Sequence, residues 1–322
     1  MKSINPRLLR RFKSVGTVIG GTEGSGTERQ AALGEKLYFD TRLSRDGDLA
    51  CNTCHPLNQY GADHQPTSVG HGKLRGRRNS PTVIHAAGHL AQFWDGRARD
   101  VEEQAKGPIV NPAEMAMIGP TEVVAVLTSI PGYVVTFKEA FPGEANPITY
   151  DNIGRAIGSF ERRLVTRSRW DHFLDGDHTA LTAEELEGLK IFADVGCVQC
   201  HTGEYLGGSM FQKVGSVEPW PNQTDQGRYE LTNQEGDRMQ FKVPSLRNIA
   251  KTAPYFHDGS VATLDIAVRE MGRYQLGVPL TDQEVQLIVA WLGCLTGDLP
   301  AAYATAPELP PDGPRTAQMA KK

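Results

Sequence analysis

A five-residue pattern, Cys-x-x-Cys-His, occurs twice in this chain and constrains its fold more than any other feature. One copy occupies residues 51–55 (CNTCH) and the other residues 197–201 (CVQCH). Two thiols at this spacing can form thioether bonds to the vinyl groups of a haem, and the adjoining histidine can bind the haem iron. The chain is therefore predicted to carry two covalently bound haem c groups, held by Cys51, Cys54, His55, Cys197, Cys200 and His201.

Other uses of paired cysteines fit this sequence less well. A structural zinc site needs four ligands, and a thiol–disulfide redox pair needs no histidine after its second cysteine. A cytoplasmic protein that never carries haem is the remaining alternative. The two motifs use four of the five cysteines, and the fifth, Cys294, lies in an apolar helical pattern that is typical of a small buried thiol.

Length and charge set further bounds. A chain of 322 residues is long enough for two domains, each with its own core. The 34 basic and 38 acidic residues give no bias toward nucleic acid or a membrane surface. No apolar run reaches the roughly 20 residues that span a bilayer. In bacteria, haem is attached to thiols outside the cytoplasmic membrane, so we expect a periplasmic protein. The basic start has no apolar segment after it, and we therefore expect a mature chain without its signal peptide.

Apolar residues recur mostly at helical spacing, while alternating strand patterns are scarce, so the fold is predicted to be mainly α. Helices are expected from Gln30 onward, over residues 121–130 and over residues 151–165. Capping boxes at Thr182 and Thr281 predict two further helix starts.

Two stretches are predicted to be loops. Residues 20–26 are rich in glycine. Residues 61–80 are rich in glycine, proline and histidine and show no periodicity. A loop of that length inside a compact domain usually has a function.

An internal repeat accompanies the two motifs. The segments before them are alike, GEKLY at 34–38 and GLKIF at 188–192. After each motif comes a proline with a small hydroxyl residue, at 81–82 and 244–245, and an Asp-Gly pair follows each proline at the same spacing. These matches predict two copies of one cytochrome c-like haem domain. The expected divisions are an N-terminal haem domain at 1–165, a C-terminal haem domain at 166–302 and an extended tail at 303–322.

The sixth ligand of each iron decides whether a haem binds small molecules or only transfers electrons. Spacing alone leaves several candidates open. For the first haem His71 is favoured, because its glycine neighbours place it on backbone that can approach or leave the iron. A thioether ligand would raise the reduction potential of the second haem. The candidates for the first haem are His64, His71, His85 and His89, and those for the second are Met210, Met239, His257 and Met271.

Several longer motifs give the chain a close resemblance to the bacterial dihaem cytochrome c peroxidases over nearly all of residues 30–302. The matching segments are LS at 43–44 with CNTCH at 51–55, TSVGHG at 67–72, RNSPTV at 78–83, AQFWDGRA at 91–98, EQAKGPI at 103–109, LRN at 246–248, TAPYFH at 252–257, MG at 271–272 and QLG at 275–277.

The resemblance implies roles that spacing could not assign. It implies that His55 and His71 ligate a peroxidatic haem, with His71 leaving on activation, and that His201 and Met271 ligate an electron-transfer haem. Glu114 would be the distal acid and base, which suits a carboxylate that must move a proton between the peroxide oxygens. The other implied site residues are Gln104, the polar partner of that acid, Trp94, between the haems, and Asn79, Thr252 and Pro254, at an inter-domain calcium.

The implied function is reduction of hydrogen peroxide to water, with electrons from a small cytochrome c or a cupredoxin, in a homodimer. Two other functions stay open, a dihaem electron carrier without catalysis and a dihaem oxidase of another substrate. Lys73, His85 and His89 depart from the usual pattern of the family around the switching loop. Met271 distinguishes the chain from related enzymes that oxidise tryptophan on a methylamine dehydrogenase precursor and use a tyrosine at that position.

Overall fold

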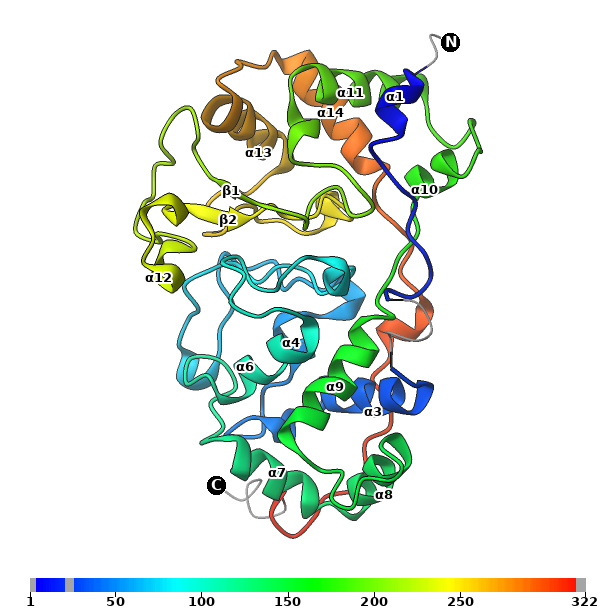
Figure 1. Ribbon diagram of the computed structural model, residues 1–322, viewed down its shortest axis with the longest axis vertical. Helices are drawn as coiled ribbons and strands as arrows, with labels where there is room; N and C mark the ends of the chain where they lie inside the picture. The colour runs from blue at the N-terminus through cyan, green and yellow to red at the C-terminus, as the bar shows by residue number, and fades with distance from the viewer. Residues whose placement is uncertain (1–3, 21–25, 317–322) are drawn as a thin grey trace.

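The computed structural model describes residues 4–20 and 26–316, and most of the predicted loop at 20–26 lies outside them. The chain forms two lobes, one above the other (Figure 1). The lower lobe contains α3 (Glu28–Phe39), α4 (Cys51–Cys54), α5 (Val101–Gln104), α6 (Lys106–Val110), α7 (Pro120–Thr128), α8 (Pro131–Ala140) and α9 (Tyr150–Glu161). The upper lobe contains α1 (Pro6–Leu9), α10 (Arg169–Leu174), α11 (Ala183–Asp194), α12 (Tyr229–Thr232), α13 (Leu264–Glu270) and α14 (Asp282–Gly293).

The fold is mainly α, as predicted. Within the described residues, the sheet consists of β1 (Phe211–Lys213) and β2 (Gln240–Lys242), which pair antiparallel on the side of the upper lobe that faces the lower one. Long connections without regular structure carry much of the rest of the chain, including residues 61–80 apart from a short 3₁₀ turn at His71–Lys73.

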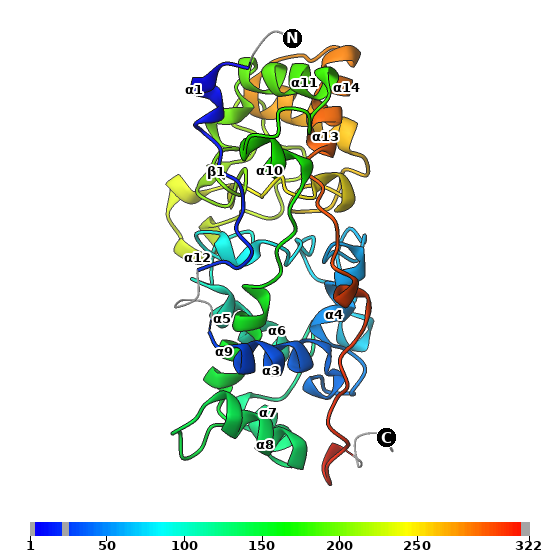
Figure 2. The same cartoon turned by 90° about the vertical axis from the view of Figure 1, so that its right-hand side faces the viewer.

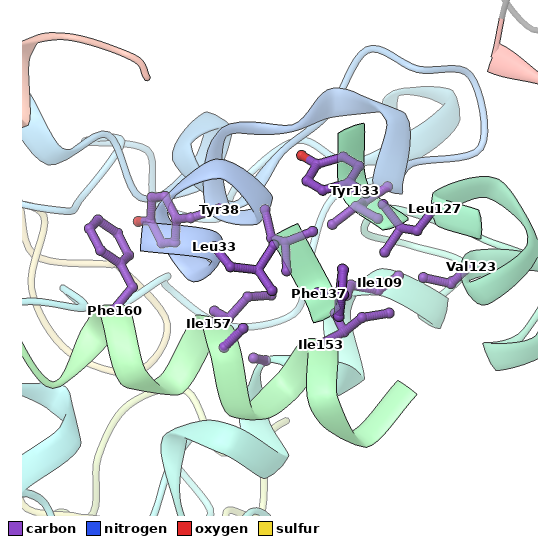
Figure 3. Packing of buried hydrophobic residues seen from close by; sticks show 14 of the residues in the cluster. Leu33, Tyr38, Ile109, Val123, Leu127, Tyr133, Phe137, Ile153, Ile157 and Phe160 are labelled. Carbon is purple, nitrogen blue, oxygen red and sulfur yellow. The ribbon is translucent and has the colours of Figure 1, made fainter. Parts of the chain in front are cut away.

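The core of the lower lobe forms where α3 crosses α9 (Figure 3). Leu33 and Tyr38 on α3 are fully buried against Ile153 and Ile157 on α9. The helices approach closely at Gly34, where an added Cβ would lie 1.9 Å from the Ala156 carbonyl oxygen. Glycine is thus required at this crossing, and burial of the apolar side chains stabilises it by roughly 1.5–3 kcal/mol for each large residue.

The core of the upper lobe is a second crossing of the same kind, between α11 and α14. Leu189 and Trp291 are fully buried there. Gly188 makes the close approach, because an added Cβ would lie 1.9 Å from the Leu287 carbonyl oxygen. The capping boxes predicted at Thr182 and Thr281 are confirmed, and they begin α11 and α14.

Both ends of the chain cross from one lobe to the other (Figure 2). The N-terminal segment packs on the upper lobe through Ile4 and Phe12 before the chain enters α3 in the lower one. The segment after α14 runs down the lower lobe, where Arg42 donates to the Pro310 carbonyl oxygen (2.9 Å) and Arg315 pairs with Glu122 (3.1 Å). The lobes are therefore connected by three passages of chain, including the one between α9 and α10.

The other sequence expectations about elements agree closely with the structure. The helices expected over 121–130 and 151–165 are α7 and α9, and the second ends earlier than expected, at Glu161. Cys294 is buried at the end of α14. In the described part of the chain no single helix could cross a membrane, although α7 and α8, bent by 105° at their junction, meet the length and hydropathy criteria as a pair.

Candidate haem sites

The first motif places its two cysteines on α4 and its histidine directly after that helix. His55 donates its main-chain N–H to the Cys51 carbonyl oxygen (2.9 Å) and accepts a hydrogen bond on its own carbonyl oxygen from the Tyr38 hydroxyl (2.7 Å). Its Nδ1 lies 3.2 Å from the Gly61 carbonyl oxygen. Since a carbonyl can only accept, Nδ1 carries the proton and Nε2 keeps the lone pair that an iron needs.

The second motif repeats this geometry in the upper lobe. His201 donates its N–H to the Cys197 carbonyl oxygen (3.0 Å), and its Nδ1 lies 3.0 Å from the Leu206 carbonyl oxygen. Burial lowers the pKa of His55 and of His201. Both imidazoles are therefore neutral at pH 7, which is the form that binds metal.

The four motif cysteines form no disulfide with any described residue, and each is half-buried near its histidine. Burial raises the pKa of Cys54 to about 11 and that of Cys197 to about 12, so they are not the exposed thiolates of a redox pair. Within residues 4–20 and 26–316 no cluster of three or more His, Cys, Asp or Glu side chains could hold a metal ion. The donor set fits haem c and does not fit zinc.

The hydroxyl residues of the sequence repeat contact the two loops whose carbonyl oxygens orient His55 and His201. Thr82 Oγ1 donates to the Tyr60 carbonyl oxygen (2.6 Å) and accepts from the Ile84 N–H (3.1 Å). In the upper lobe, Ser245 Oγ donates to the Tyr205 carbonyl oxygen (2.6 Å) and accepts from the Arg247 N–H (3.1 Å). Tyr60 precedes Gly61 and Tyr205 precedes Leu206, so each hydroxyl fixes the loop whose carbonyl orients a motif histidine.

The structure brings His71 and Glu114 together in the lower lobe. The His71 N–H donates to the Glu114 carbonyl oxygen (2.8 Å). Gly70 lies against the same segment, because an added Cβ would be 2.0 Å from the Ala113 carbonyl oxygen. His71 Nδ1 lies 3.2 Å from an Asp46 carboxylate oxygen, although the geometry does not make a hydrogen bond.

The Glu114 side chain is half-buried and oriented by one hydrogen bond. Its Oε1 accepts a hydrogen bond from the Asn111 amide (2.9 Å). Burial raises the pKa of Glu114, while Arg97 and the bond from Asn111 act in the opposite direction. Gln104 ends α5 and is half-buried, and it makes no hydrogen bond to Glu114.

Trp94 lies in the seam between the lobes. Its Nε1 donates to the Asn79 carbonyl oxygen (2.9 Å), and its ring meets that of His257 edge-on, with centroids 6.4 Å apart. The Asn79 N–H donates across the seam to the His257 carbonyl oxygen (2.8 Å). Asn79 Nδ2 donates to the Gln65 carbonyl oxygen (3.0 Å).

The predicted calcium residues come from both sides of this seam. His64 Nδ1 lies 3.0 Å from the Ala253 carbonyl oxygen, so the 64–65 segment contacts both Asn79 and the 252–254 segment. Thr252 and Pro254 flank Ala253, and the Ala253–Pro254 peptide bond is cis. Amide and carbonyl oxygens of these residues are the hard donors that calcium prefers.

The remaining iron-ligand candidates differ in their surroundings. Met271 is half-buried and begins a π-helical turn, Met271–Leu276, that continues α13. Met239 is buried in a cluster with Trp220 and Phe241. His257 stacks on Phe241 with ring centroids 4.1 Å apart.

His85 and His89 lie in the seam and have protein partners there. His85 Nε2 is 3.2 Å from Thr166 Oγ1, and His89 Nδ1 is 3.3 Å from the Lys242 ammonium. Sequence reasoning missed Lys242 and also Arg78, which bridges Asp95 (2.6 Å) and Asp225 (2.6 Å). Arg78 begins the RNSPTV segment, but no local pattern indicates the ion pairs of Arg78 or the contacts of Lys242, because their partners are distant in the sequence.

Comparisons with known proteins agree with this geometry. A family model described as di-haem cytochrome c peroxidase matches residues 28–179. The cytochrome c551 peroxidase of Nitrosomonas europaea is 48% identical over 293 residues, which cover 89% of this chain and 86% of that protein. The chain belongs to the di-haem cytochrome c peroxidase family. Membership makes it a haem-dependent oxidoreductase and implies two haem c groups.

Two further matches extend the comparison. The cytochrome c551 peroxidase of Pseudomonas aeruginosa is 47% identical over 299 residues, covering 91% of this chain and 86% of that protein. Among solved structures, a MauG-like protein associated with microbial copper homeostasis is 28% identical, with a TM-score of 0.78 and coverage of 92% of this chain and 97% of the other. The fold is thus shared with this solved structure over most of the chain.

Proposed function

We propose that this peroxidase reduces hydrogen peroxide to two waters, using two protons and two electrons from a small cytochrome c or a cupredoxin in the periplasm. The observation that carries the proposal is the difference between the lobes. Both hold a neutral, carbonyl-bound histidine beside two thiols, but in the lower lobe a glycine-flanked histidine and a half-buried glutamate share a main-chain hydrogen bond. The lower haem would therefore be the peroxidatic one.

The haem at His55, when bound, supplies the iron that binds peroxide and delivers electrons to it. Glu114 would move the proton from one peroxide oxygen to the other, so that the O–O bond breaks and the protonated oxygen leaves as water. Burial raises its pKa, which favours proton uptake, and Asn111 fixes its orientation. Gln104 would hold the peroxide or its water near this acid.

We infer that His71 ligates the lower haem at rest and leaves when the upper haem is reduced. His201 and Met271 would hold the upper haem, which accepts the electrons. Trp94, in the seam, would lie on the path between them, and a calcium bound by Asn79, Thr252 and Pro254 would stabilise the same seam. A homodimer is the expected assembly.

The arrangement also supports a division of the chain into two copies of one haem unit, at 1–165 and 166–302, with a tail at 303–322. Equivalent residues make equivalent hydrogen bonds behind His55 and His201, and both helix crossings depend on a glycine. In this division each end of the chain packs on the haem unit that is farther from it in the sequence. Residues 4–15 serve the upper unit, and the tail serves the lower one.

The test is electron paramagnetic resonance of the fully oxidised and half-reduced enzyme, with turnover of peroxide measured on the same samples. The proposal expects a low-spin bis-histidine signal that disappears on half-reduction as turnover begins. His71→Gly should give an open lower haem without reduction, and His178→Gly, at an exposed site, should not. Two haems that stay six-coordinate and inactive in every sample would leave an electron carrier as the function.

A further inference from the structure

The seam between the lobes contains one buried lysine with an unusual set of partners. Lys242 ends β2 in the upper lobe and is 7% exposed. Its main-chain N–H donates to the Trp94 carbonyl oxygen (2.7 Å), and its Nζ donates to the Ala91 carbonyl oxygen (2.8 Å). The same Nζ lies 3.3 Å from His89 Nδ1. One residue of the upper lobe therefore holds the 89–94 segment of the lower lobe at three points.

The 89–94 segment that Lys242 contacts contains one residue with an unfavourable backbone conformation. Phe93, between the two main-chain contacts, has φ of +65°, which is costly for a residue with a side chain. Such a conformation persists when its surroundings fix it on both sides. The orientation of Trp94 is thereby tied to Lys242.

Among the residues that the structure describes, no carboxylate forms an ion pair with the Lys242 ammonium. Asp95 is the acid that favours the charged form, but it is itself paired with Arg78 (2.6 Å) and Arg97 (3.0 Å). Burial lowers the pKa of Lys242 to about 8, with Asp95 opposing the shift. A lysine in this position can therefore gain and lose its proton near physiological pH.

The two histidines nearest Lys242 are neutral, whereas Arg78 and Arg97 keep their charge in ion pairs with Asp95. Burial lowers the pKa of His89 well below its usual range, with Lys242 and His85 adding to the effect. Burial also lowers the pKa of His85, to about 3, and Arg247 lowers it further while Asp171 opposes. Lys242 is thus the group whose charge changes between His89 and Asp95.

This charge lies close to the loops that hold the upper haem ligand. The His89 ring packs on Gly208, where an added Cβ would be 2.3 Å from its Cδ2. The Leu90 N–H donates to the Gly208 carbonyl oxygen (2.7 Å), and Leu206, two residues earlier, is the acceptor for His201 Nδ1. A charge buried in such a place is weakly screened by solvent and salt.

We propose that Lys242 is a positioning residue for electron passage between the haems: its contacts fix the Trp94 segment, and its buried positive charge favours the reduced upper haem. The inference rests on the proposed roles of His201 and Trp94. A positive charge near a redox centre stabilises the added electron, so loss of the charge makes reduction less favourable. Neutralisation is expected to lower the equilibrium constant for reducing the upper haem by about tenfold.

The experiment compares the wild-type holoenzyme with Lys242→Met, which keeps the length of the side chain but not its charge. Lys213→Met is the matched control, because Lys213 lies exposed on the neighbouring strand β1. The potential of the upper haem is measured by spectroelectrochemical titration from pH 6 to pH 10. The rate of its oxidation is followed by stopped flow after half-reduced enzyme meets peroxide.

The wild type and Lys213→Met are expected to show a potential that falls as pH rises through about 8, since deprotonation removes the charge. Lys242→Met should give a low potential without this step, equal to the high-pH value of the wild type, and a slower electron transfer. The pKa of Glu161, in the lower lobe, is also raised to about 8. The step is therefore assigned to Lys242 by comparing the pH profile of Lys242→Met with that of the wild type.

An unchanged potential and pH profile in Lys242→Met would overturn the inference. If this variant does not fold, His89→Gln tests the same contact. A wild-type potential that shows no step near pH 8 would also overturn the inference. Absence of peroxide turnover in the wild type would instead count against the proposed function, and the potentials, which need no peroxide, would still decide the role of the charge.

Discussion

The two lobes hold their motif histidines with equivalent hydrogen bonds, but they differ in the other residues predicted to lie near each haem. His55 and His201 are oriented by loop carbonyl oxygens at nearly the same distance, and a hydroxyl residue fixes each loop. The lower lobe adds Glu114 and a histidine on irregular backbone, whereas the upper lobe offers a methionine on a helix. One arrangement of helix, cysteines and histidine thus recurs in both lobes, and under the proposed function the segments that carry His71, Glu114 and Met271 would determine what each haem does.

The strongest test of this difference is Glu114→Gln. Glutamine retains the shape and the contact with Asn111 but cannot carry a proton. General acid–base catalysis contributes about 10²–10⁴-fold, so kcat/KM for peroxide should fall by that factor. Steady-state assays with a reduced electron donor measure the loss.

The matched control is Glu122→Gln, on α7, whose carboxylate pairs with Arg315 at the surface. It should retain full activity. Equal turnover in both variants would show that the lower lobe lacks a catalytic carboxylate at position 114, and the functional difference between the lobes would need another source.

Much of the architecture was predictable from local signals. The motifs at 51–55 and 197–201 predict the attachment sites, because two thioether bonds need thiols at this spacing and the iron needs the histidine that follows them. Apolar periodicity and the capping boxes at Thr182 and Thr281 located the main helices, since both act within a few residues. The hydroxyl residues of the repeat also stand in equivalent places in the structure.

The seam could not be predicted in the same way. Lys242 and His89 are far apart in the sequence, and each alone resembles an ordinary polar residue. The pairing of Arg78 with Asp225 likewise arises only when the lobes meet. The roles of Glu114 and Trp94 came from the family resemblance, because a single acid or aromatic residue has no pattern of its own.

A second test concerns the residue two positions after each hydroxyl residue of the repeat. This residue is Ile84 in the lower lobe and Arg247 in the upper one. Arg247 is 1% exposed and pairs with Asp171 at 2.9 Å. Asp171 also accepts the Val15 N–H (2.9 Å), so the pair anchors the N-terminal segment. Asp171→Asn leaves a buried cation without its counter-charge and should cost about 3–5 kcal/mol of unfolding free energy in the upper lobe.

Denaturant titration read at each haem separately measures this cost. Burial raises the pKa of Asp171, but Arg247 outweighs it and the native pKa is lowered. The stabilisation by the ion pair is therefore present above the ordinary pKa of about 4 and is lost as pH falls through the native value. Loss of stability in the lower lobe alone would contradict the assignment of the N-terminal segment to the upper one.

A smaller effect is expected at Glu161, on α9, where the equivalent crossing helix of the upper lobe has Leu292. Burial raises the pKa of Glu161 to about 8, Glu102 adds to the shift and Arg162 opposes it. The unfolded carboxyl titrates near 4, so native stability is greatest below that pH and falls as pH rises toward 8. Glu161→Gln should remove this slope and stabilise the lower lobe by about 1–3 kcal/mol at pH 8. Unfolding curves at pH 5 and pH 8 measure it, and the same slope in the variant would assign the titration to another group.

The finest test of the comparison uses the hydroxyl residues themselves. Thr82→Val and Ser245→Ala each remove a hydroxyl that donates to a tyrosine carbonyl oxygen and accepts from a main-chain N–H two residues later. Each change should cost about 1 kcal/mol of unfolding free energy, because both groups are part-buried in equivalent turns. Unfolding monitored at the haem of the altered lobe measures the two costs independently. Equal costs would show that the loops behind His55 and His201 are equivalent in energy as well as in geometry. A cost confined to one lobe would show that the other holds its histidine by different means.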